Sequence, residues 1–468
     1  MTDFAPLLRP DRGEPAHLIH LVDKASAADW LKCQPAPRRA LLDAMRFDGK
    51  SAHRCAVFPA DGGGFEVVAS VAKLERLTPW CLAQVAGALP AGTYRLADRA
   101  PGVGALGWLL ASHCFDRYRT APDPGVGPRI LLTPEVATID RIVAEAAATA
   151  LVRDLVDTPA ADLGPAELEA AVRALGDESG AKVEVTLGDK LETGFPLIAA
   201  VGRGATRERG PRLIELVWGR DDHPRIAVIG KGVCFDSGGL DIKSASGMRL
   251  MKKDMGGAAH ALALAHLIIV QRLPVRLHLL IPAVENSVSA AAFRPGDVIG
   301  SRRGLKVEID NTDAEGRLVL GDALTRAGEE APELIIDFAT LTGAARVALG
   351  PDLPALFVND DALAAQLLAA ADNRADPMWR MPLWDDYDEM LKSSLADLAN
   401  SADSPMAGAV TAALFLRRFV PDGVAWAHLD TFAWRASARP GRPKGGDALG
   451  LRAVFAALET RFAARHSA

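Results

Sequence analysis

Cysteine is scarce in this sequence, and the spacing of the few cysteines excludes two classes of protein. The 468 residues include five cysteines, an odd number, with no C-x-x-C pair and no zinc-finger spacing. A disulfide-stapled secreted domain and a cysteine-ligated zinc site are therefore excluded. This cysteine usage is typical of a protein in a reducing compartment.

The sequence also lacks an excess of positive charge and any apolar run long enough to span a membrane. Its 59 acidic and 53 basic side chains give a net charge of −6, which offers no overall attraction to nucleic acid or anionic membranes. The most apolar stretch, GGAAHALALAHLIIV, is interrupted by two histidines and is shorter than the roughly 20 residues of a bilayer span. The N-terminus shows no secretory signal pattern. We therefore expect a soluble, cytoplasmic protein without a membrane partner, and a nucleic-acid partner would need a local basic patch.

The length and the order of apolar segments predict an α/β protein with two domains. Residues 1–132 are expected to form a small N-terminal α/β domain, to which no chemical motif assigns a role. Residues 133–160 carry a helical pattern that opens at Thr133, with Pro134 at its first position, and are expected to link the domains. Residues 161–468 are expected to form a larger α/β domain with a mostly parallel, helix-covered central sheet. Its expected strands include KVEVTL, PLIAAVG, LIELVWG, RIAVIGKG, RLHLLIPAV and ELIIDFATL.

Charged residues are crowded into two short glycine-rich segments of the larger domain, KGVCFDSGGLDIK and NTDAEGRL. The first follows an apolar strand, so Asp236 is expected at the carboxyl edge of the sheet, where open α/β sheets bind ligands. In the second, Asp313 and Glu315 are two residues apart. An extended backbone would project both carboxylates, and Arg317 after them, to one side.

Another acid, Asp254, precedes the apolar helix and on its own is better explained as a helix cap. Taken together, however, the four carboxylates lie at element ends beside glycine-rich backbone, and this indicates a shared site. Clustered carboxylates repel one another unless cations neutralise them. Without an H-E-x-x-H motif or a cysteine cluster, the ligand set is rich in oxygen and is compatible with zinc, manganese or magnesium. Two such ions, roughly 3.5 to 4 Å apart, can hold a hydroxide nucleophile between them.

Two lysines, Lys231 and Lys243, frame the first segment. A lysine beside metal ions is disfavoured in its charged form, so its pKa is expected to fall and a neutral amine becomes available as a ligand or proton carrier. The plainer interpretation is that a lysine only balances the charge of the acids. Two lysines at the ends of one loop favour the functional interpretation.

At these residues the sequence resembles the leucine aminopeptidase family, also called cytosol aminopeptidases, which are two-metal exopeptidases. NTDAEGRL matches the family signature completely, and GKGVCFDSGGLDIK, KKDMGGAA and DFATLTGA are similar to three further blocks in the same order. The likeness runs from about Leu151 to near the end of the chain. It is weak or undetectable across the N-terminal domain.

The resemblance implies a dinuclear metal site within residues 161–468. One metal would be bound by Lys231, Asp236, Asp254 and Glu315. The other would be bound by Asp236, Asp313 and Glu315, with the main-chain carbonyl of Asp313. The metals implied are zinc or manganese.

The resemblance also implies catalytic and substrate-binding roles. Lys243 would polarise the scissile carbonyl, and Arg317 would hold a bicarbonate ion that acts as the general base. Met251, Thr340 and Gly343 match positions that line the pocket for the first substrate side chain. Leu341 matches a position whose main-chain carbonyl helps to hold the substrate.

The activity implied is hydrolysis of the first peptide bond by a metal-bridging hydroxide, on peptides with a free N-terminus, in a homohexamer. One segment departs from the family. Where relatives read H-x-D-I-A-G, this chain reads HLDTFAWRASARPG, so Phe432 and Trp434 replace small residues in a region that borders the specificity pocket in the family. The departure affects the preferred N-terminal residue and not peptide-bond hydrolysis.

Three other functions compete with this interpretation. A two-metal phosphoesterase would use similar bridging acids, but the sequence has no G-x-x-x-x-G-K-[ST] loop. A DNA-binding regulator, with or without peptidase activity, is disfavoured by the acidic balance, although RRGLK and the arginines near Arg207 allow a local basic patch. An inactive scaffold would need a lost ligand or catalytic lysine, and none is lost.

Overall fold

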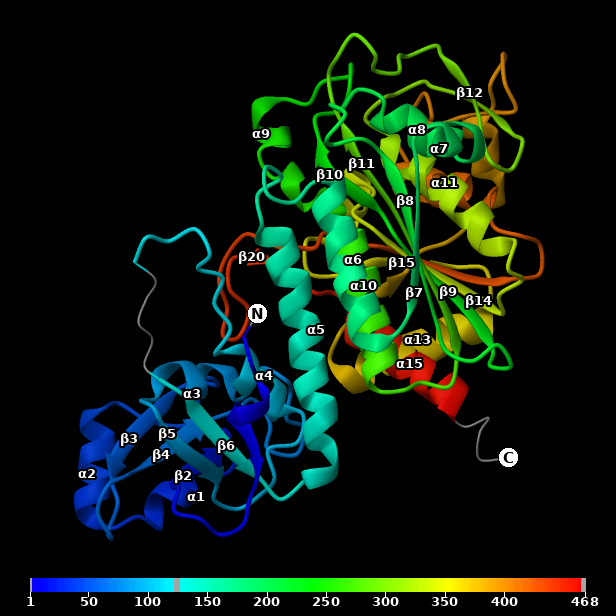
Figure 1. The fold of residues 1–468 in the computed structure, drawn as a ribbon. Helices are drawn as coiled ribbons and strands as arrows, with labels where there is room; N and C mark the ends of the chain where they lie inside the picture. The colour runs from blue at the N-terminus through cyan, green and yellow to red at the C-terminus, as the bar shows by residue number, and fades with distance from the viewer. Residues whose placement is uncertain (1, 122–126, 464–468) are drawn as a thin grey trace. The chain divides into compact units, whose positions relative to one another are not determined.

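The computed structural model describes residues 2–121 and 127–463, and the chain divides into two compact units. The first unit comprises residues 1–150 and 436–444, and the second comprises residues 151–435 and 445–468. The division falls inside the helix α5 (Ile139–Asp157) (Figure 1). Within the described residues, every helix is too short or too polar to cross a membrane.

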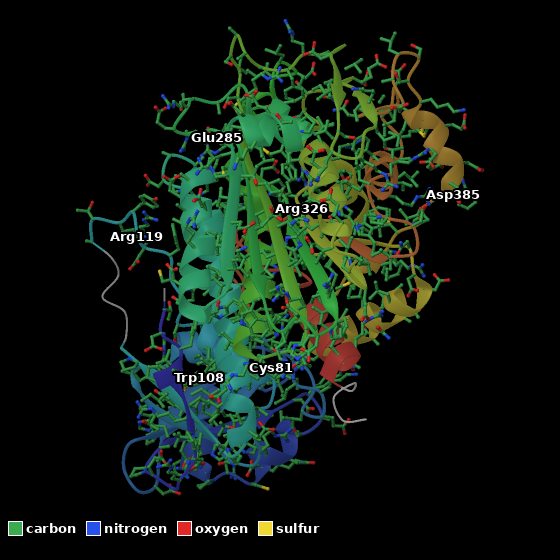
Figure 2. The ribbon with its side chains drawn as sticks, turned by 45° about the vertical axis from the view of Figure 1, so that its right-hand side comes forward. Cys81, Trp108, Arg119, Glu285, Arg326 and Asp385 are labelled. Atoms are coloured by element: carbon green, nitrogen blue, oxygen red, sulfur yellow. The ribbon has the colours of Figure 1, made fainter. Side chains whose placement is uncertain are left out.

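The first unit is built on one sheet whose neighbouring strands are parallel except for the pair of β3 and β4. The strands lie in the order β1 (Leu8–Pro10), β6 (Arg129–Thr133), β5 (Gly92–Leu96), β2 (His17–Val22), β4 (Phe65–Ser70), β3 (Cys55–Pro59). Its helices include α1 (Ala27–Lys32), α2 (Ala36–Ala44), α3 (Ala83–Ala88) and α4 (Gly104–Leu110). Trp108 of α4 is fully buried, and its indole N–H donates to the carbonyl of Arg129, which ties the helix to the sheet (Figure 2).

The second unit is built on a larger, mostly parallel sheet, as the sequence predicted. Its strands lie in the order β16 (Trp379–Arg380), β15 (Ala355–Val358), β18 (Ala425–Asp430), β14 (Leu334–Ala339), β9 (Arg225–Gly230), β11 (Arg276–Asn286), β8 (Arg212–Trp218), β7 (Lys182–Leu187), with β10 (Gly232–Asp236) also paired to β11. The antiparallel pairs are β7 with β8, β8 with β11, and β15 with β18. All six residues of β14 are buried, as expected for a strand covered on both faces.

Helices pack against this sheet in two groups (Figure 1). One group contains α6 (Pro165–Ser179), α10 (Gly256–Val270), α13 (Asp361–Arg374) and α15 (Leu451–Ala463). The other contains α7 (Asp189–Gly194), α8 (Pro196–Gly202), α11 (Glu315–Gly328) and α14 (Gly408–Arg417). The shorter elements are α9 (Ala245–Met248), α12 (Gly343–Leu349), β12 (Val298–Gly300), β13 (Lys306–Glu308), β17 (Leu398–Ala399), β19 (Trp434–Arg435) and β20 (Gly445–Gly446).

Two elements differ from the sequence-based expectation. PLIAAVG, expected to be a strand, is the helix α8, because Pro196 starts it and the carboxylate of Asp322 accepts hydrogen bonds from the free backbone N–H groups of its first turn. The long helix begins at Ile139 and not at Thr133. Thr133 ends the strand β6, where it pairs with Pro10 of β1.

Candidate metal centre

The four acids of the predicted metal site come together at the carboxyl ends of the parallel strands. β9 ends at Gly230 and delivers Lys231, and β10, the next strand along the chain, ends with Asp236. Asp254 lies in a 3₁₀ turn (η3, Met251–Met255) directly before α10, and Glu315 is the first residue of α11. The fold therefore brings together acids that are up to 79 positions apart in the sequence, since Asp236 and Glu315 are at 315 − 236 = 79.

The separation of the acids is small enough for shared metal ligation. One carboxylate oxygen from each of Asp236, Asp313 and Glu315 lies within 4.8 Å of the others. The amine of Lys231 lies 2.6 Å from Asp254 Oδ2 and 2.8 Å from Glu315 Oε1. All five predicted metal-binding side chains are thus placed in one cluster.

The two lysines lie on different sides of this cluster. Lys243 Nζ is 2.9 Å from Asp236 Oδ2 and also contacts Asp313, whereas Lys231 contacts Asp254 and Glu315. The side chain of Lys231 has room beside the first turn of α11 because residue 316 is glycine. A Cβ on Gly316 would lie 2.5 Å from Lys231 Cε, closer than real contacts allow.

The backbone of NTDAEGRL is not extended, and this corrects one step of the sequence-based argument. The side-chain oxygen of Asn311 accepts a hydrogen bond from the N–H of Asp313 at 2.8 Å, which turns the chain, and α11 then begins at Glu315. Asp313 and Glu315 converge because of this turn and not because of strand alternation. Arg317, in the first turn of α11, is buried and reaches the same cavity by its length.

Burial and mutual repulsion leave this cluster with carboxylates that are hard to ionise. Burial and the neighbouring Asp236 raise the pKa of Asp313 to about 6 and the pKa of Glu315 to about 8. Asp254 goes the other way: burial opposes its ionisation, but Lys231 and Lys253 lower its pKa. Full ionisation of the four carboxylates therefore requires more positive charge than the protein places among them.

The donor set fits a pair of divalent cations. The buried oxygens Asp254 Oδ2 and Glu315 Oε1 both contact the amine of Lys231, and Asp313 Oδ1 contacts the amine of Lys243, so two amines are shared among the carboxylates of the cluster. Buried carboxylate oxygens are normally hydrogen-bonded or bound to a metal. Oxygen donors with one amine suit zinc or manganese.

The charge state expected for the lysine amines depends on those cations. Burial by itself would lower the pKa of Lys231, but among the protein groups alone Asp254 and Glu315 raise it. The same balance of burial against Asp236 and Asp313 raises the pKa of Lys243. A neutral amine at Lys231 therefore requires additional positive charge among the acids.

A cavity of about 330 Å³ opens above the cluster. Every residue predicted to bind substrate lines it, namely Met251, Thr340, Leu341 and Gly343, together with the catalytic candidates Lys243 and Arg317. Thr340 also donates hydrogen bonds from its hydroxyl to Asp254, at 2.8 Å to Oδ1 and 3.0 Å to the main-chain carbonyl. The wall of the cavity is thereby fixed to a predicted metal ligand.

Several positioning residues were missed by the sequence analysis. Asn286, at the end of β11, donates to Asp236 Oδ1 at 2.9 Å and to the carbonyl of Thr312 at 3.1 Å, so it holds both halves of the site. Its place at the end of an apolar strand was a usable signal. Asp430 accepts hydrogen bonds from the N–H groups of Leu341 and Thr342, and no sequence pattern pointed to it.

Two further cations face the cavity. Lys253, which is fully buried, and Arg346 line the cavity and were not predicted. Phe432, expected to border the pocket, is not part of the lining but lies beneath both cations, 5.6 Å from Lys253 Nζ and 4.6 Å from the Arg346 guanidinium carbon. Trp434 lies against Lys252.

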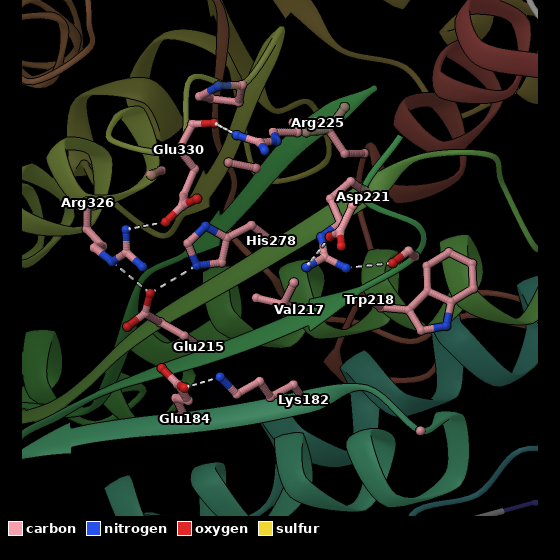
Figure 3. A pocket seen from close by; sticks show the side chains of 17 residues that line it. Lys182, Glu184, Glu215, Val217, Trp218, Asp221, Arg225, His278, Arg326 and Glu330 are labelled. Carbon is pink, nitrogen blue, oxygen red and sulfur yellow. Dashed lines mark hydrogen bonds and ion pairs between the residues drawn. The ribbon is translucent and has the colours of Figure 1, made fainter. Parts of the chain in front are cut away.

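A second cavity, of about 420 Å³, lies at the opposite end of the same sheet, around the start of β9 and the end of β8 (Figure 3). Its charged side chains pair with one another. Glu215 contacts both His278 and Arg326 at 3.0 Å, and Arg326 also contacts Glu330 at 2.9 Å. None of the predicted site residues lies there.

Comparison with known families covers both units of the chain. The profile of the cytosol aminopeptidase family, catalytic domain, matches residues 150–455, and the profile of the M17 aminopeptidase N-terminal domain matches residues 18–125. The second match corrects the expectation that family likeness is absent from the N-terminal domain. Its strands are short and carry no chemical motif, so the likeness is not visible in one sequence.

Individual relatives agree with the profiles. The probable cytosol aminopeptidase of Syntrophotalea carbinolica is 43% identical over 370 residues, which cover 75% of this chain and 73% of that protein. A crystal structure of the cytosol aminopeptidase from Coxiella burnetii is 46% identical, with a TM-score of 0.91 over 97% of this chain and 99% of that one. The bottromycin maturation enzyme BotP, solved in complex with Mn, is 32% identical with a TM-score of 0.85, over 96% of this chain and 100% of that one.

Proposed function

We propose a division of roles among the residues of this site, starting from the fact that the chain belongs to the cytosol aminopeptidase family of metal-dependent exopeptidases, which remove N-terminal residues from peptides. The observation that carries the proposal is the convergence of Asp236, Asp313 and Glu315 within 4.8 Å, flanked by two lysines. Neither competing function, phosphoesterase or DNA-binding regulator, gains support from these findings.

Lys231, Asp236, Asp254, Asp313 and Glu315 are the residues that would hold two divalent metal ions. Zinc and manganese both suit this donor set, and a relative solved with Mn favours testing manganese first. When bound, such ions supply positive charge that polarises a carbonyl and lowers the pKa of a water molecule. The raised pKa of Glu315 is consistent with a site that ionises fully only when cations are present.

Lys243 is the residue placed to donate a hydrogen bond to the scissile carbonyl. It is half-buried, lies on the cavity side of the cluster, and contacts Asp236 and Asp313. A cationic donor aimed at a carbonyl oxygen gains strength as negative charge develops on that oxygen. Asp254, at the other side, is placed to accept hydrogen bonds from the α-amine of the substrate, which explains the need for a free N-terminus.

Arg317 is the residue that would hold a bicarbonate ion acting as the general base. One of its terminal nitrogens donates to the carbonyl of Asn400 at 2.7 Å, but its Nε is buried without a hydrogen-bond partner among the described residues. Burial lowers the pKa of Arg317 to about 10, which reflects a cation short of an anionic partner. An anion with two oxygens in a plane matches the guanidinium fork.

Two further assignments follow from the family resemblance. We assign the protein to the cytoplasm and its working form to a homohexamer. Its substrates would be peptides with a free N-terminus, held with help from the main-chain carbonyl of Leu341.

The test is hydrolysis of a panel of aminoacyl nitroanilides by metal-stripped full-length protein, with zinc, manganese or cobalt added back. We expect no hydrolysis before metal addition and full activity after it. N-acetylated versions of the same substrates should remain intact, because they lack the free amine. Hydrolysis that persists after complete metal removal, or that ignores N-acetylation, would overturn the proposal.

A further inference from the structure

Arg346 extends the wall of the cavity where the first substrate side chain is expected. It lies one helical turn after Gly343 in α12, so both residues share a face of that helix. The guanidinium lies against Gly343, because a Cβ built on that glycine would be 3.6 Å from Arg346 Nη2. Met251 and Thr340 line the same cavity.

Arg346 carries a charge that no described side chain neutralises. Its guanidinium contacts the ring of Phe432 and Gly343, and it forms no ion pair with a carboxylate within residues 2–121 and 127–463. Lys253, the neighbouring cation, differs in this respect because its amine donates to Asp254 Oδ1 at 3.1 Å. Arg346 therefore presents its guanidinium, a planar cationic group, to the cavity.

Phe432 holds the guanidinium in place without neutralising it. The guanidinium carbon of Arg346 lies 4.6 Å above the ring, and Lys253 Nζ lies 5.6 Å from the same ring. Stacking on an aromatic face orients the planar guanidinium and leaves the N–H groups at its edge free to bind an anion. Phe432 is anchored through Thr431, whose N–H donates to the carbonyl of Ala339 in β14.

The position of the α-amine fixes where the substrate side chain must lie. Amine and side chain branch from the same carbon, and Asp254, which would receive the amine, is hydrogen-bonded to Thr340 in the cavity wall. The side chain therefore points along the wall formed by Thr340, Gly343 and Arg346. A leucine side chain would desolvate the guanidinium without compensation, whereas a carboxylate would pair with it in a two-point contact.

We propose that Arg346, stacked on Phe432, recognises the side-chain carboxylate of an N-terminal aspartate or glutamate, so that this enzyme prefers peptides beginning with an acidic residue. The inference rests on the proposed function, because it assumes that the α-amine binds at Asp254. Arg346 acts here as a specificity determinant and takes no part in bond cleavage.

The test compares kcat/KM for glutamyl, aspartyl, leucyl and lysyl nitroanilides on manganese-loaded full-length protein. We expect the glutamyl or aspartyl substrate to exceed the leucyl one, and Arg346→Met to lower that ratio by about tenfold to a hundredfold, the range expected for a hydrogen-bonded ion pair. Arg346→Lys should retain part of the preference. Arg346→Glu should favour the lysyl substrate instead. The control is Arg220→Met, because Arg220 is an exposed arginine near the opposite end of the sheet. This control should leave every ratio of kcat/KM between substrates unchanged.

Two further measurements test the inference even if substitutions at Arg346 prevent folding. The acidic preference of the wild-type protein should weaken as ionic strength rises, since salt screens a pair that is open to solvent. Phe432→Leu, which removes the ring but keeps Arg346, should reduce the preference without abolishing leucyl hydrolysis.

The outcomes separate this inference from the proposed function. Good leucyl hydrolysis without any acidic preference would overturn the inference alone, whereas no hydrolysis of any substrate would overturn the proposed function. Nitroanilides have no C-terminal carboxylate. If Arg346→Met slows only dipeptides with a free C-terminus, the arginine binds the α-carboxylate of the substrate, and the inference is also wrong.

Discussion

The two ends of the central sheet carry similar residue types but use them in opposite ways. At the carboxyl end, Asp313 and Glu315 face a cavity of about 330 Å³, and burial with Asp236 raises the pKa of each. At the opposite end, Glu215 faces a larger cavity of about 420 Å³ (Figure 3). Burial opposes its ionisation there as well, yet hydrogen bonding to His278 and the charge of Arg326 lower its pKa.

The proposed metal site therefore lies at the smaller of these two cavities, so the volume of a cavity is not the observation that identifies it. Each carboxylate of the larger cavity has a basic partner, so the group is complete as a structural ion-pair network. The smaller cavity instead brings four carboxylates into one cluster, where burial and the neighbouring Asp236 raise the pKa of Asp313 and of Glu315. Added cations would allow these carboxylates to ionise, which is the chemistry of a metal site.

Removing one carboxylate at each end should give the largest contrast. Glu315→Gln should abolish stable metal binding and lower kcat/KM by more than about a thousandfold, because it removes charge stabilisation larger than that of one oxyanion donor. Glu215→Gln should keep both metals and the activity. Elemental analysis and nitroanilide kinetics measure the two effects. A Glu315→Gln protein that retains two metals per chain would contradict the assignment.

Removing one lysine at each end tests catalysis apart from metal binding. Lys243→Ala should bind both metals yet lose about a hundredfold or more in kcat, since it removes a charged donor to the developing oxyanion. Lys182→Ala is the matched control, because Lys182 lines the opposite cavity and pairs with Glu184. Loss of metal with a normal residual rate in Lys243→Ala would count against its catalytic role.

Removing the central arginine of the opposite cavity should affect stability only. Arg326→Met leaves buried Glu215 and its partner His278 without their cation, and we expect a loss of about 1 to 3 kcal/mol in the free energy of unfolding, reduced by the partial exposure of Arg326. Urea denaturation measures this loss. The folded fraction should keep its metals and its kcat/KM, and a selective loss of activity would mean that the larger cavity takes part in function.

The parts of the site that the sequence predicted are those with a local signal. Lys231 and Asp236 follow an apolar strand, and the strand pattern of β9 and β14 could be read from continuous apolar runs. Asp313 and Glu315 were assigned correctly to one cluster although the backbone argument was wrong. The turn at Asn311 depends on a side-chain hydrogen bond that alternation rules do not describe.

The parts that the sequence did not predict depend on contacts between distant segments. PLIAAVG becomes a helix because Asp322, more than a hundred residues later, accepts hydrogen bonds from its first turn. Arg346 and Phe432 are 86 positions apart, from 432 − 346, and neither reveals its partner in the sequence. Such pairs are set by packing of the complete fold and not by local propensity.

A buried histidine–carboxylate pair on the strands β14 and β18 allows a further test of how a basic partner changes a buried titratable group. His428 Nδ1 and Asp337 Oδ1 lie 2.5 Å apart, and Trp426 donates its indole N–H to the other oxygen of Asp337. Burial by itself would lower the pKa of His428, but Asp337 raises it above the ordinary value of 6.5. The pair resembles that of Glu215 and His278 in composition but is fully enclosed by the sheet.

The sign of the pH dependence follows from that raised pKa. The folded protein holds the proton of His428 more tightly than the unfolded chain, so the stabilisation is complete below about pH 6.5 and is lost as the pH rises through the folded-state pKa. The free energy of unfolding should therefore fall above pH 6.5, by at most about 1.4 kcal/mol per pH unit for this single group. His428→Gln should lack this pH-dependent component. Urea denaturation of both proteins between pH 6 and pH 9 should therefore show that their free energies of unfolding converge as the pH rises. Parallel plots of the free energy of unfolding against pH would show that His428 is neutral in the folded protein.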